Sequence, residues 1–279
     1  MASPELTSTR SPRVQAARRL AKRAFRAADR RFIAEGPQAV REAVADPDRV
    51  VEIFVTAEAA ARYEAIVSAA TDAGLPVQRV SGEVMGALAQ TVTPQGIAAV
   101  CTFLDVPLDV VVAARPRLVA VLAHVRDPGN AGTVIRCADA AGADAVVLTA
   151  ASVDVYNSKC VRASAGSVFH LPVVVGLSAE QATAALRTAG CAVLAADGAG
   201  SRDLDDVIDS GELTRPTAWL FGNEAWGLPD ELLGLADEVV RVPIHGAAES
   251  LNLATAAAVC LYASARAQRA KGGSAARSG

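Results

Sequence analysis

The feature that most constrains the fold is a series of short, almost uninterrupted apolar runs in the second half of the chain. Stretches with helical character separate nearly all of these runs. Strands that are apolar throughout, rather than alternately apolar and polar, are typical of parallel sheets that are buried on both faces. The pattern therefore predicts an α/β domain with a mostly parallel sheet covered by helices. The runs lie at residues 118–125, 145–150, 171–175, 191–197, 217–222 and 238–244.

The composition indicates how such a core is filled and in which compartment the chain folds. Hydrophobic residues make up 52% of the chain and aromatic residues only 4%, so Ala, Val and Leu must fill the core. The five cysteines include no C-x-x-C pair, and the three histidines adjoin no cysteine pair, so we expect neither disulfides nor a metal site. The longest apolar stretch, 253–265, is too short to cross a bilayer. These features predict a cytoplasmic protein without a membrane segment.

A smaller α/β unit precedes the apolar runs. The pattern predicts a helix over 32–45, which the chain enters through Gly36 and Pro37. A stretch with a proline at each end, 104–117, then interrupts the alternation, and we place a linker and a domain boundary near residue 112. The remaining elements of this unit are predicted as strands near 50–56, 76–80 and 97–103 and as helices at 57–73 and from 81. We expect domains at 1–112 and 113–268 and a disordered tail at 269–279.

Positive charge is concentrated near the N-terminus, although the net charge of the whole chain is −3. Residues 10–31 contain nine Arg and Lys residues and a single acidic residue, Asp29. On one continuous helix, four of these arginines would share a face and could lie along a phosphate backbone. A solvated helix is the alternative, and Arg162 is a second candidate that is either an RNA contact or a helix-end charge. The four arginines are Arg19, Arg23, Arg26 and Arg30.

Three segments that follow apolar runs are rich in Gly, Asn, Ser and Glu. They are RDPGNAGTVIR (126–136), FGNEAWGLPDEL (221–232) and VPIHGAAESLNLATAAAVCLYA (242–263). In open α/β sheets ligands bind beyond the carboxyl ends of the strands, so these segments predict a site there. The first segment lacks the G-x-G-x-x-G spacing of a dinucleotide fold and the G-K-[ST] of a phosphate loop. A nucleotide-dependent oxidoreductase is therefore a weaker interpretation.

The ordered set of segments resembles the SPOUT superfamily, specifically the SpoU or TrmH branch of RNA ribose 2′-O-methyltransferases. The matching stretches are 127–148, 221–244 and 249–263. Residues 32–44, FIAEGPQAVREAV, also resemble the substrate-binding module of that branch, which is a ribosomal-protein-like α/β RNA-binding domain. The resemblance implies S-adenosylmethionine as cofactor, a deep C-terminal trefoil knot and a homodimer. It favours large-subunit (23S) ribosomal RNA as substrate, with a transfer RNA methyltransferase or a non-catalytic RNA-binding protein as alternatives.

The resemblance also implies roles for individual residues of this chain. The residues implied as catalytic are Asn130, Arg136, Glu224, Ser250 and Asn252. The residues implied for the cofactor pocket are Leu220, Gly222, Val242, Ile244, Leu251 and Leu253.

Arg136 is the residue whose chemistry needs a separate hypothesis. Removal of the hydroxyl proton by Arg136 has been suggested for the family, yet a guanidinium pKa above about 12 leaves almost none of the group neutral. We therefore favour Arg136 as a clamp on the target phosphate that stabilises the developing alkoxide. Ser250 or a phosphate oxygen would then relay the proton.

Overall fold

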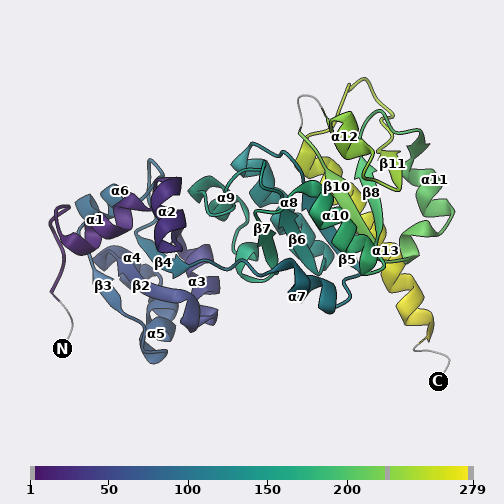
Figure 1. Ribbon diagram of the computed structural model, residues 1–279. Helices are drawn as coiled ribbons and strands as arrows, with labels where there is room; N and C mark the ends of the chain where they lie inside the picture. The colour runs from purple at the N-terminus through teal and green to yellow at the C-terminus, as the bar shows by residue number, and fades with distance from the viewer. Residues whose placement is uncertain (1–3, 224–226, 276–279) are drawn as a thin grey trace. The chain divides into compact units, whose positions relative to one another are not determined.

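The computed structural model describes residues 4–223 and 227–275, with side chains as far as residue 270. The chain divides into two compact units (Figure 1). The first unit consists of Met1–Leu104 together with Asp154–Phe169, and the second of Asp105–Val153 with His170–Gly279. A short segment from the second half of the chain therefore folds as part of the first unit. The predicted limits, 1–112 and 113–268, place this segment in the second domain. The domain limits themselves stay a prediction.

The first unit contains a four-stranded sheet in the order β1-β4-β2-β3. β4 pairs antiparallel with both β1 and β2, whereas β2 and β3 are parallel. The strands are β1 (Arg31–Glu35), β2 (Val50–Val55), β3 (Val77–Arg79) and β4 (Ile97–Thr102). The helices are α1 (Pro12–Arg19), α2 (Arg23–Asp29), α3 (Pro37–Ala45), α4 (Ala57–Arg62), α5 (Glu64–Asp72), α6 (Gly82–Leu88) and α9 (Ser158–Ala163), with the short 3₁₀ turns η1 (Pro47–Arg49) and η2 (Ser167–Phe169).

The two faces of this sheet are covered by different segments. Ile33 belongs to the core in which α1 and α6 pack on the sheet. Successive side chains of a strand point to opposite faces, so Phe32 lies on the other side. Its ring centroid lies 4.8 Å from that of Tyr156 and 6.0 Å from that of Phe169. The segment 154–169 therefore supplies part of the core of the first unit.

The helix predicted over 32–45 is correct only from Pro37 onward. Residues 31–35 instead form β1, which pairs along its whole length with β4. Gly36 then takes a φ of +93°, a conformation that favours glycine, and Pro37 occupies the first turn of α3. The apolar run Phe32–Ala34 is compatible with a strand or a helix, and pairing with β4 decides between them.

The expectation of one continuous basic helix is wrong. α1 ends at Arg19 and α2 begins at Arg23, so the arginines do not follow one helical face. Arg26 is only 3% exposed. Its guanidinium forms an ion pair of 2.6 Å with Asp154 and donates to the carbonyl oxygens of Leu20 and Ala21, both at 2.8 Å. Arg26 therefore holds the turn between the two helices and is not available to a phosphate backbone.

The second unit contains a seven-stranded sheet in the order β7-β6-β5-β10-β8-β11-β9. Every neighbouring pair in it is parallel, which confirms the predicted mostly parallel sheet. Each of the six apolar runs became a strand, and β9 is an additional short edge strand. The strands are β5 (Leu118–Leu122), β6 (Ala145–Leu148), β7 (Val173–Val175), β8 (Ala192–Ala196), β9 (Arg202–Asp203), β10 (Thr217–Phe221) and β11 (Glu238–Arg241).

Helices cover both faces of this sheet. One core cluster joins β5, β8 and β10 to α7, α10 and α12. On the other face the Trp219 Nε1 donates a hydrogen bond of 2.8 Å to the Ser264 hydroxyl on α13, and both side chains are fully buried. The helices are α7 (Leu108–Ala113), α8 (Pro128–Ala141), α10 (Ala179–Thr188), α11 (Leu204–Asp209), α12 (Asp230–Leu233) and α13 (Leu253–Ala275), with the 3₁₀ turn η3 (Glu212–Thr214).

The C-terminal helix α13 continues further than the sequence predicted. The disordered tail was expected from residue 269, but the helix ends at Ala275. Arg269 donates a hydrogen bond of 3.1 Å to the Ala141 carbonyl at the end of α8, which ties this part of the helix to its neighbour. Residues 276–279 lie outside the described residues. None of the helices in the described part of the chain is both long enough and apolar enough to cross a membrane.

Candidate active site

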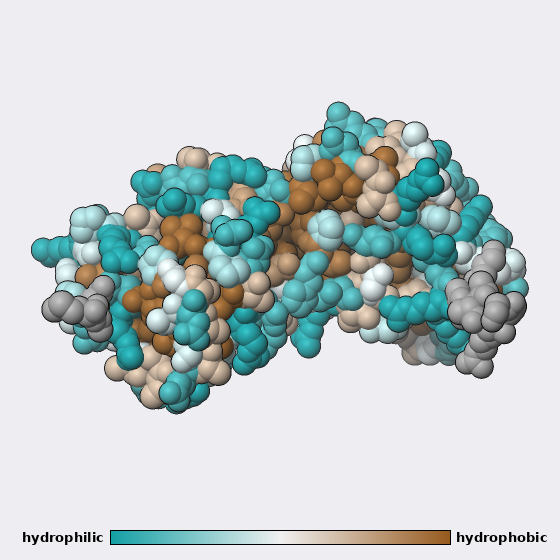
Figure 2. Space-filling view, turned by 90° about the horizontal axis from the view of Figure 1, so that it is seen from below, coloured by the Kyte–Doolittle hydropathy of each residue, from teal (hydrophilic) through white to brown (hydrophobic). Residues whose placement is uncertain are grey.

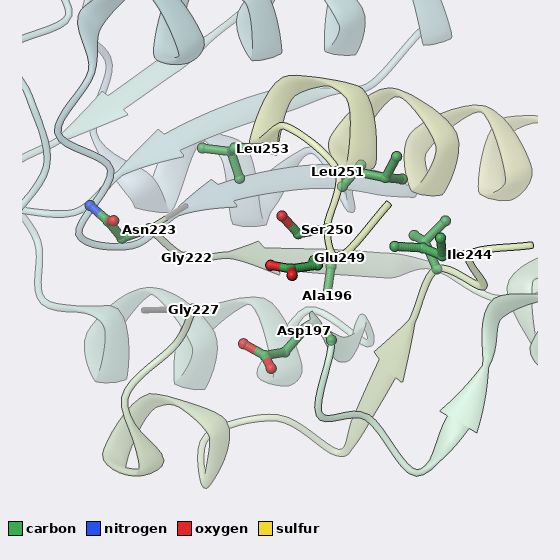
Figure 3. A pocket seen from close by; sticks show the side chains of 13 residues that line it. Ala196, Asp197, Gly222, Asn223, Gly227, Ile244, Glu249, Ser250, Leu251 and Leu253 are labelled. Carbon is green, nitrogen blue, oxygen red and sulfur yellow. The ribbon is translucent and has the colours of Figure 1, made fainter. Parts of the chain in front are cut away.

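A cavity of about 320 Å³ lies at the carboxyl ends of β8, β10 and β11 (Figure 3). This is the edge of the sheet at which the sequence predicted a site, because parallel strands bring their ends together there. The lining residues come from four stretches of the second unit. They are Ala196, Asp197, Gly198, Gly222, Asn223, Gly227, Val242, Ile244, Glu249, Ser250, Leu251, Leu253 and Ala256.

Most of the residues predicted for the cofactor pocket line this cavity. Gly222, Val242, Ile244, Leu251 and Leu253 do so. The remaining one, Leu220, does not. Its side chain is fully buried in the core cluster between the sheet and α7, α10 and α12. The structure therefore brings the second and third predicted segments together, while the part that each residue plays in cofactor binding stays a prediction.

The backbone at Gly222 explains why a glycine stands at the start of the second segment. Asn223 and Gly227 exchange backbone hydrogen bonds of 2.9 and 3.1 Å, so the chain turns back on itself here. A Cβ on Gly222 would lie 2.7 Å from the Gly227 carbonyl oxygen and 2.7 Å from the Leu228 Cγ. No larger side chain fits unless backbone moves. Glu224, which is predicted as catalytic, lies outside the described residues.

The first and third predicted segments meet through a pair of asparagines. Asn252 Nδ2 donates to Asn130 Oδ1 at 3.2 Å, although the two residues are 122 positions apart. Asn252 Oδ1 also accepts from the Ala254 backbone N–H at 2.9 Å, which caps the first turn of α13. Ser250 precedes this cap and lines the cavity together with Glu249, between Ala196 and Leu253 (Figure 3). The predicted polar residues Asn130, Ser250 and Asn252 thus lie at one end of the sheet.

Arg136 lies one and a half turns beyond Asn130 on α8, where its side chain is exposed. It does not line the cavity, and no hydrogen bond or ion pair within the described residues holds its guanidinium. Burial raises the pKa of the neighbouring Cys137 thiol, and the Arg136 charge offsets this only in part. Burial likewise raises the pKa of Cys191 to about 11 and that of Cys260 to about 12. Burial thus disfavours the thiolate form of all three cysteines.

Sequence reasoning missed Asp197, Asn223 and Glu249, which also line the cavity. Asp197 directly follows β8, so its position at a strand end was the signal that could have found it. Its two carboxylate oxygens accept hydrogen bonds from the Ala199 and Leu228 backbone N–H groups, at 2.9 and 3.0 Å. Asn223 and Glu249 lie in the second and third predicted segments, in which neighbouring residues were predicted as functional.

The arginines predicted to contact RNA differ in exposure and in partners. Besides the buried Arg26, Arg19 forms an ion pair of 2.6 Å with Asp29, and Arg162 one of 3.2 Å with Glu35. Arg30 stacks over the Phe103 ring at 4.7 Å from its centroid. Arg23 is exposed, and no ion pair or hydrogen bond holds its side chain within the described part of the chain. A role of these arginines in RNA binding stays a prediction, except at Arg26, whose burial contradicts it.

Comparisons with known proteins agree with this arrangement. The model of the SpoU rRNA Methylase family matches residues 117–262, and the model for RNA 2′-O ribose methyltransferase substrate binding matches residues 33–107. A curated relative from Bacillus subtilis, the 23S rRNA (guanosine(2553)-2′-O)-methyltransferase RlmP, is 34% identical over 258 residues. That alignment covers 92% of this chain and 98% of the relative.

Solved structures with bound cofactor share the fold. The AdoMet-bound rRNA methyltransferase of Sinorhizobium meliloti has a TM-score of 0.78 at 31% identity, over 94% of this chain and 97% of that one. The SpoU methyltransferase AviRb of Streptomyces viridochromogenes, in complex with AdoMet, has a TM-score of 0.78 at 28% identity, over 94% and 100%. Both parts of the chain match in the expected order, and similarity extends over nearly its whole length. The chain therefore belongs to the SpoU family of rRNA methylases.

Proposed function

We propose that this chain transfers the methyl group of S-adenosylmethionine to a ribose 2′-hydroxyl of large-subunit ribosomal RNA. The observation that carries the proposal is the cavity at the strand ends, which five of the residues predicted for the cofactor line. Membership of the SpoU family supports the methyltransferase chemistry. The relatives from Bacillus subtilis and Streptomyces viridochromogenes that are named 23S rRNA 2′-O-methyltransferases support the choice of RNA.

The cavity fits S-adenosylmethionine in size and in chemistry. Its volume of about 320 Å³ is at the lower end of the range of small-molecule sites, roughly 300 to 1,000 Å³. Val242, Ile244, Leu251 and Leu253 offer apolar surface to an adenine ring, and the backbone groups around Gly222 offer hydrogen bonds close to the ligand. When bound, S-adenosylmethionine supplies an electrophilic methyl group on a sulfonium centre.

The residues of the chain then have to orient the ribose and accept its proton. The hydrogen bond between Asn130 and Asn252 holds the first turn of α8 beside the entry to α13, which fixes the polar edge of the site. Arg136 clamps the phosphate of the target nucleotide and stabilises the negative charge that develops on the attacking oxygen. Ser250 lines the cavity and relays the proton, either itself or together with a phosphate oxygen. Glu224 completes the set of polar groups.

RNA binding falls to the first unit in this proposal, as the match of residues 33–107 to a substrate-binding module supports. The cations available for phosphate contact are those that are exposed and not held by other described residues. Figure 2 shows a mostly hydrophilic surface with apolar areas between the polar side chains on both units. The available cations near the N-terminus are Arg10, Arg18, Lys22, Arg23 and Arg31.

The proposal includes a homodimer, a deep trefoil knot formed by the last two loops, and a cytoplasmic location. The resemblance to the SPOUT superfamily implies the first two features. Val259 and Tyr262 on α13 are 40% and 53% exposed, which supports a subunit contact along this helix. The five cysteines, which include no C-x-x-C pair, support the cytoplasm, and a ribosomal RNA substrate agrees with it. Sedimentation of the purified chain at a dimer mass is the expected result, and a monomer at all concentrations would contradict the homodimer.

Calorimetric titration with S-adenosylmethionine, in parallel with a nicotinamide dinucleotide, tests the cofactor. We expect the first ligand alone to bind. Gly222→Ala should abolish this binding, because its Cβ meets the Gly227 carbonyl oxygen. Gly246→Ala is the matched control, since a Cβ there meets nothing within 4 Å. Binding of the dinucleotide alone would overturn the proposal in favour of an oxidoreductase.

A further inference from the structure

Asp197 is a lining residue of the cavity with two different hydrogen-bond partners. Its Oδ1 accepts from the Ala199 N–H at 2.9 Å, which is a local turn just after β8. Its Oδ2 accepts from the Leu228 N–H at 3.0 Å, which is 31 positions further along the chain. The Asp197 backbone N–H also donates to the Val240 carbonyl oxygen at 3.1 Å. Asp197 thus connects the end of β8 with Val240 on β11 and with Leu228, which follows β10 in the chain.

The bond to Leu228 fixes the residue that directly follows Gly227. Gly227 and Asn223 are paired through their backbones, so fixing Leu228 also fixes the position of Asn223 at the cavity wall. The carboxylate packs directly against Gly227, because a Cβ on this glycine would collide with Asp197 Oδ2. Figure 3 shows the Asp197 carboxylate directed towards Gly227 at the cavity. Bonds in which the acceptor is ionised are stronger than neutral ones.

We propose that Asp197 is a positioning residue for the cofactor cavity. Through the Leu228 N–H it holds Gly227 in place and, through the backbone pair of Gly227 with Asn223, it holds Asn223 at the cavity wall. This inference rests on the proposed function for the identity of the cofactor. The ordering of Asn223, Gly227 and Leu228 by Asp197 does not depend on the cofactor. The local turn with Ala199 uses only Oδ1, so a role limited to that turn would not require the second oxygen.

Two substitutions separate the two roles. Asp197→Ala removes both hydrogen bonds. Asp197→Asn keeps a single acceptor oxygen, which suffices for the local turn with Ala199 that asparagine favours, and it presents an N–H group to the Leu228 N–H. Asp144 provides a matched control, because its carboxylate also accepts from two backbone N–H groups, those of Arg117 at 2.7 Å and Leu118 at 2.9 Å. These bonds lie at the amino ends of β5 and β6, at the opposite edge of the sheet.

The experiment combines amide hydrogen exchange of the unliganded full chain, read by NMR at Asn223, Gly227 and Leu228, with calorimetric titration of S-adenosylmethionine. In Asp197→Ala and Asp197→Asn these amides should exchange faster and the cofactor should bind more weakly, each by on the order of ten-fold or more. Asp144→Ala should leave both quantities unchanged. The thermal unfolding midpoint of each variant shows whether the fold is retained.

Three results would overturn the inference. They are unchanged exchange in Asp197→Ala, wild-type behaviour of Asp197→Asn, and equal changes in Asp144→Ala. Faster exchange without weaker cofactor binding would overturn the link to the cavity. If the wild-type chain binds no S-adenosylmethionine, the proposed function fails, and the exchange data alone then decide whether Asp197 orders Asn223, Gly227 and Leu228.

Discussion

The two units of this protein use their polar residues in opposite ways. In the second unit, asparagine, serine and aspartate side chains from segments far apart in sequence meet at one edge of a parallel sheet. In the first unit, arginines that are close in sequence are distributed among internal ion pairs and a ring contact. Polar residues after buried strands therefore indicated a site more reliably than a cluster of charge did.

The physical reason lies in what each pattern determines. Parallel strands fix where their carboxyl ends lie, so residues that follow them are brought together by the sheet itself. A run of arginines fixes only a net charge. Whether a guanidinium faces solvent or an internal carboxylate depends on tertiary partners such as Asp154, which lies 128 positions from Arg26.

The largest effect that would sharpen this comparison is expected at Arg136. In Arg136→Lys the rate of methyl transfer should fall by roughly 100-fold or more at every pH, because lysine cannot replace a bidentate clamp. Affinity for S-adenosylmethionine, measured by calorimetry, should not change, since Arg136 does not line the cavity. Near-wild-type turnover with a lower pH optimum would instead identify Arg136 as a true base.

Arg26 should dominate the stability of the first unit. Its side chain and that of Asp154 are 4% and 14% exposed. Arg26→Ala leaves the Asp154 carboxylate and the Leu20 and Ala21 carbonyl groups without this donor, which should lower the free energy of unfolding by about 3 to 5 kcal/mol. Urea unfolding of the full chain measures this, with the exposed Arg23→Ala as control at less than about 0.5 kcal/mol. Unchanged stability together with weaker RNA binding would restore Arg26 to the RNA-contact surface.

Arg23 should show the reverse behaviour. Arg23→Ala should weaken binding to ribosomal RNA a few-fold and reduce the slope of log affinity against log salt concentration by about one. Arg62→Ala is the matched control, because Arg62 is exposed but forms an ion pair of 2.7 Å with Glu58. Filter binding at several salt concentrations measures the slope. Equal losses in both variants would show that the charge of the first unit acts as a diffuse field.

The smallest effect concerns the edge of the second sheet. A hydrogen bond from the Arg241 guanidinium lowers the pKa of Asp203, and burial opposes this. A folded pKa below the usual value means that the pair stabilises the fold above the unfolded pKa, near pH 4, and that this contribution is lost as the pH falls further. Asp203→Asn should therefore lower the thermal midpoint slightly at pH 7 and not at all in strong acid. A midpoint difference that is constant with pH would contradict the ion pair.

Most of the second unit could be predicted from the sequence. Continuous apolar runs predicted six of its strands, and five of the six residues expected around the cofactor line the cavity. Leu220 differs because side chains alternate along β10, so its side chain enters the core and not the cavity. Asp197 carried no motif, and its importance depends on a hydrogen bond to Leu228 that local sequence does not encode.

The first unit was less predictable, because long-range contacts determine it. The run Phe32–Ala34 becomes a strand only because β4 is available to pair with it. The segment 154–169 joins this unit through Tyr156, whose hydroxyl accepts from the Leu104 N–H at 2.6 Å and whose ring stacks on Phe103 at 3.8 Å. A division of the chain at a single boundary does not allow for such a segment.

Methyl transfer from radiolabelled S-adenosylmethionine to ribosomal RNA tests the central claim most directly. The reaction is run with naked ribosomal RNA, large ribosomal subunits and total transfer RNA, and nuclease digestion then identifies the labelled nucleoside. The account predicts label in a 2′-O-methyl nucleoside from large-subunit RNA. Label in a base, label in transfer RNA alone, or no transfer to any of the three despite measurable cofactor binding would contradict it.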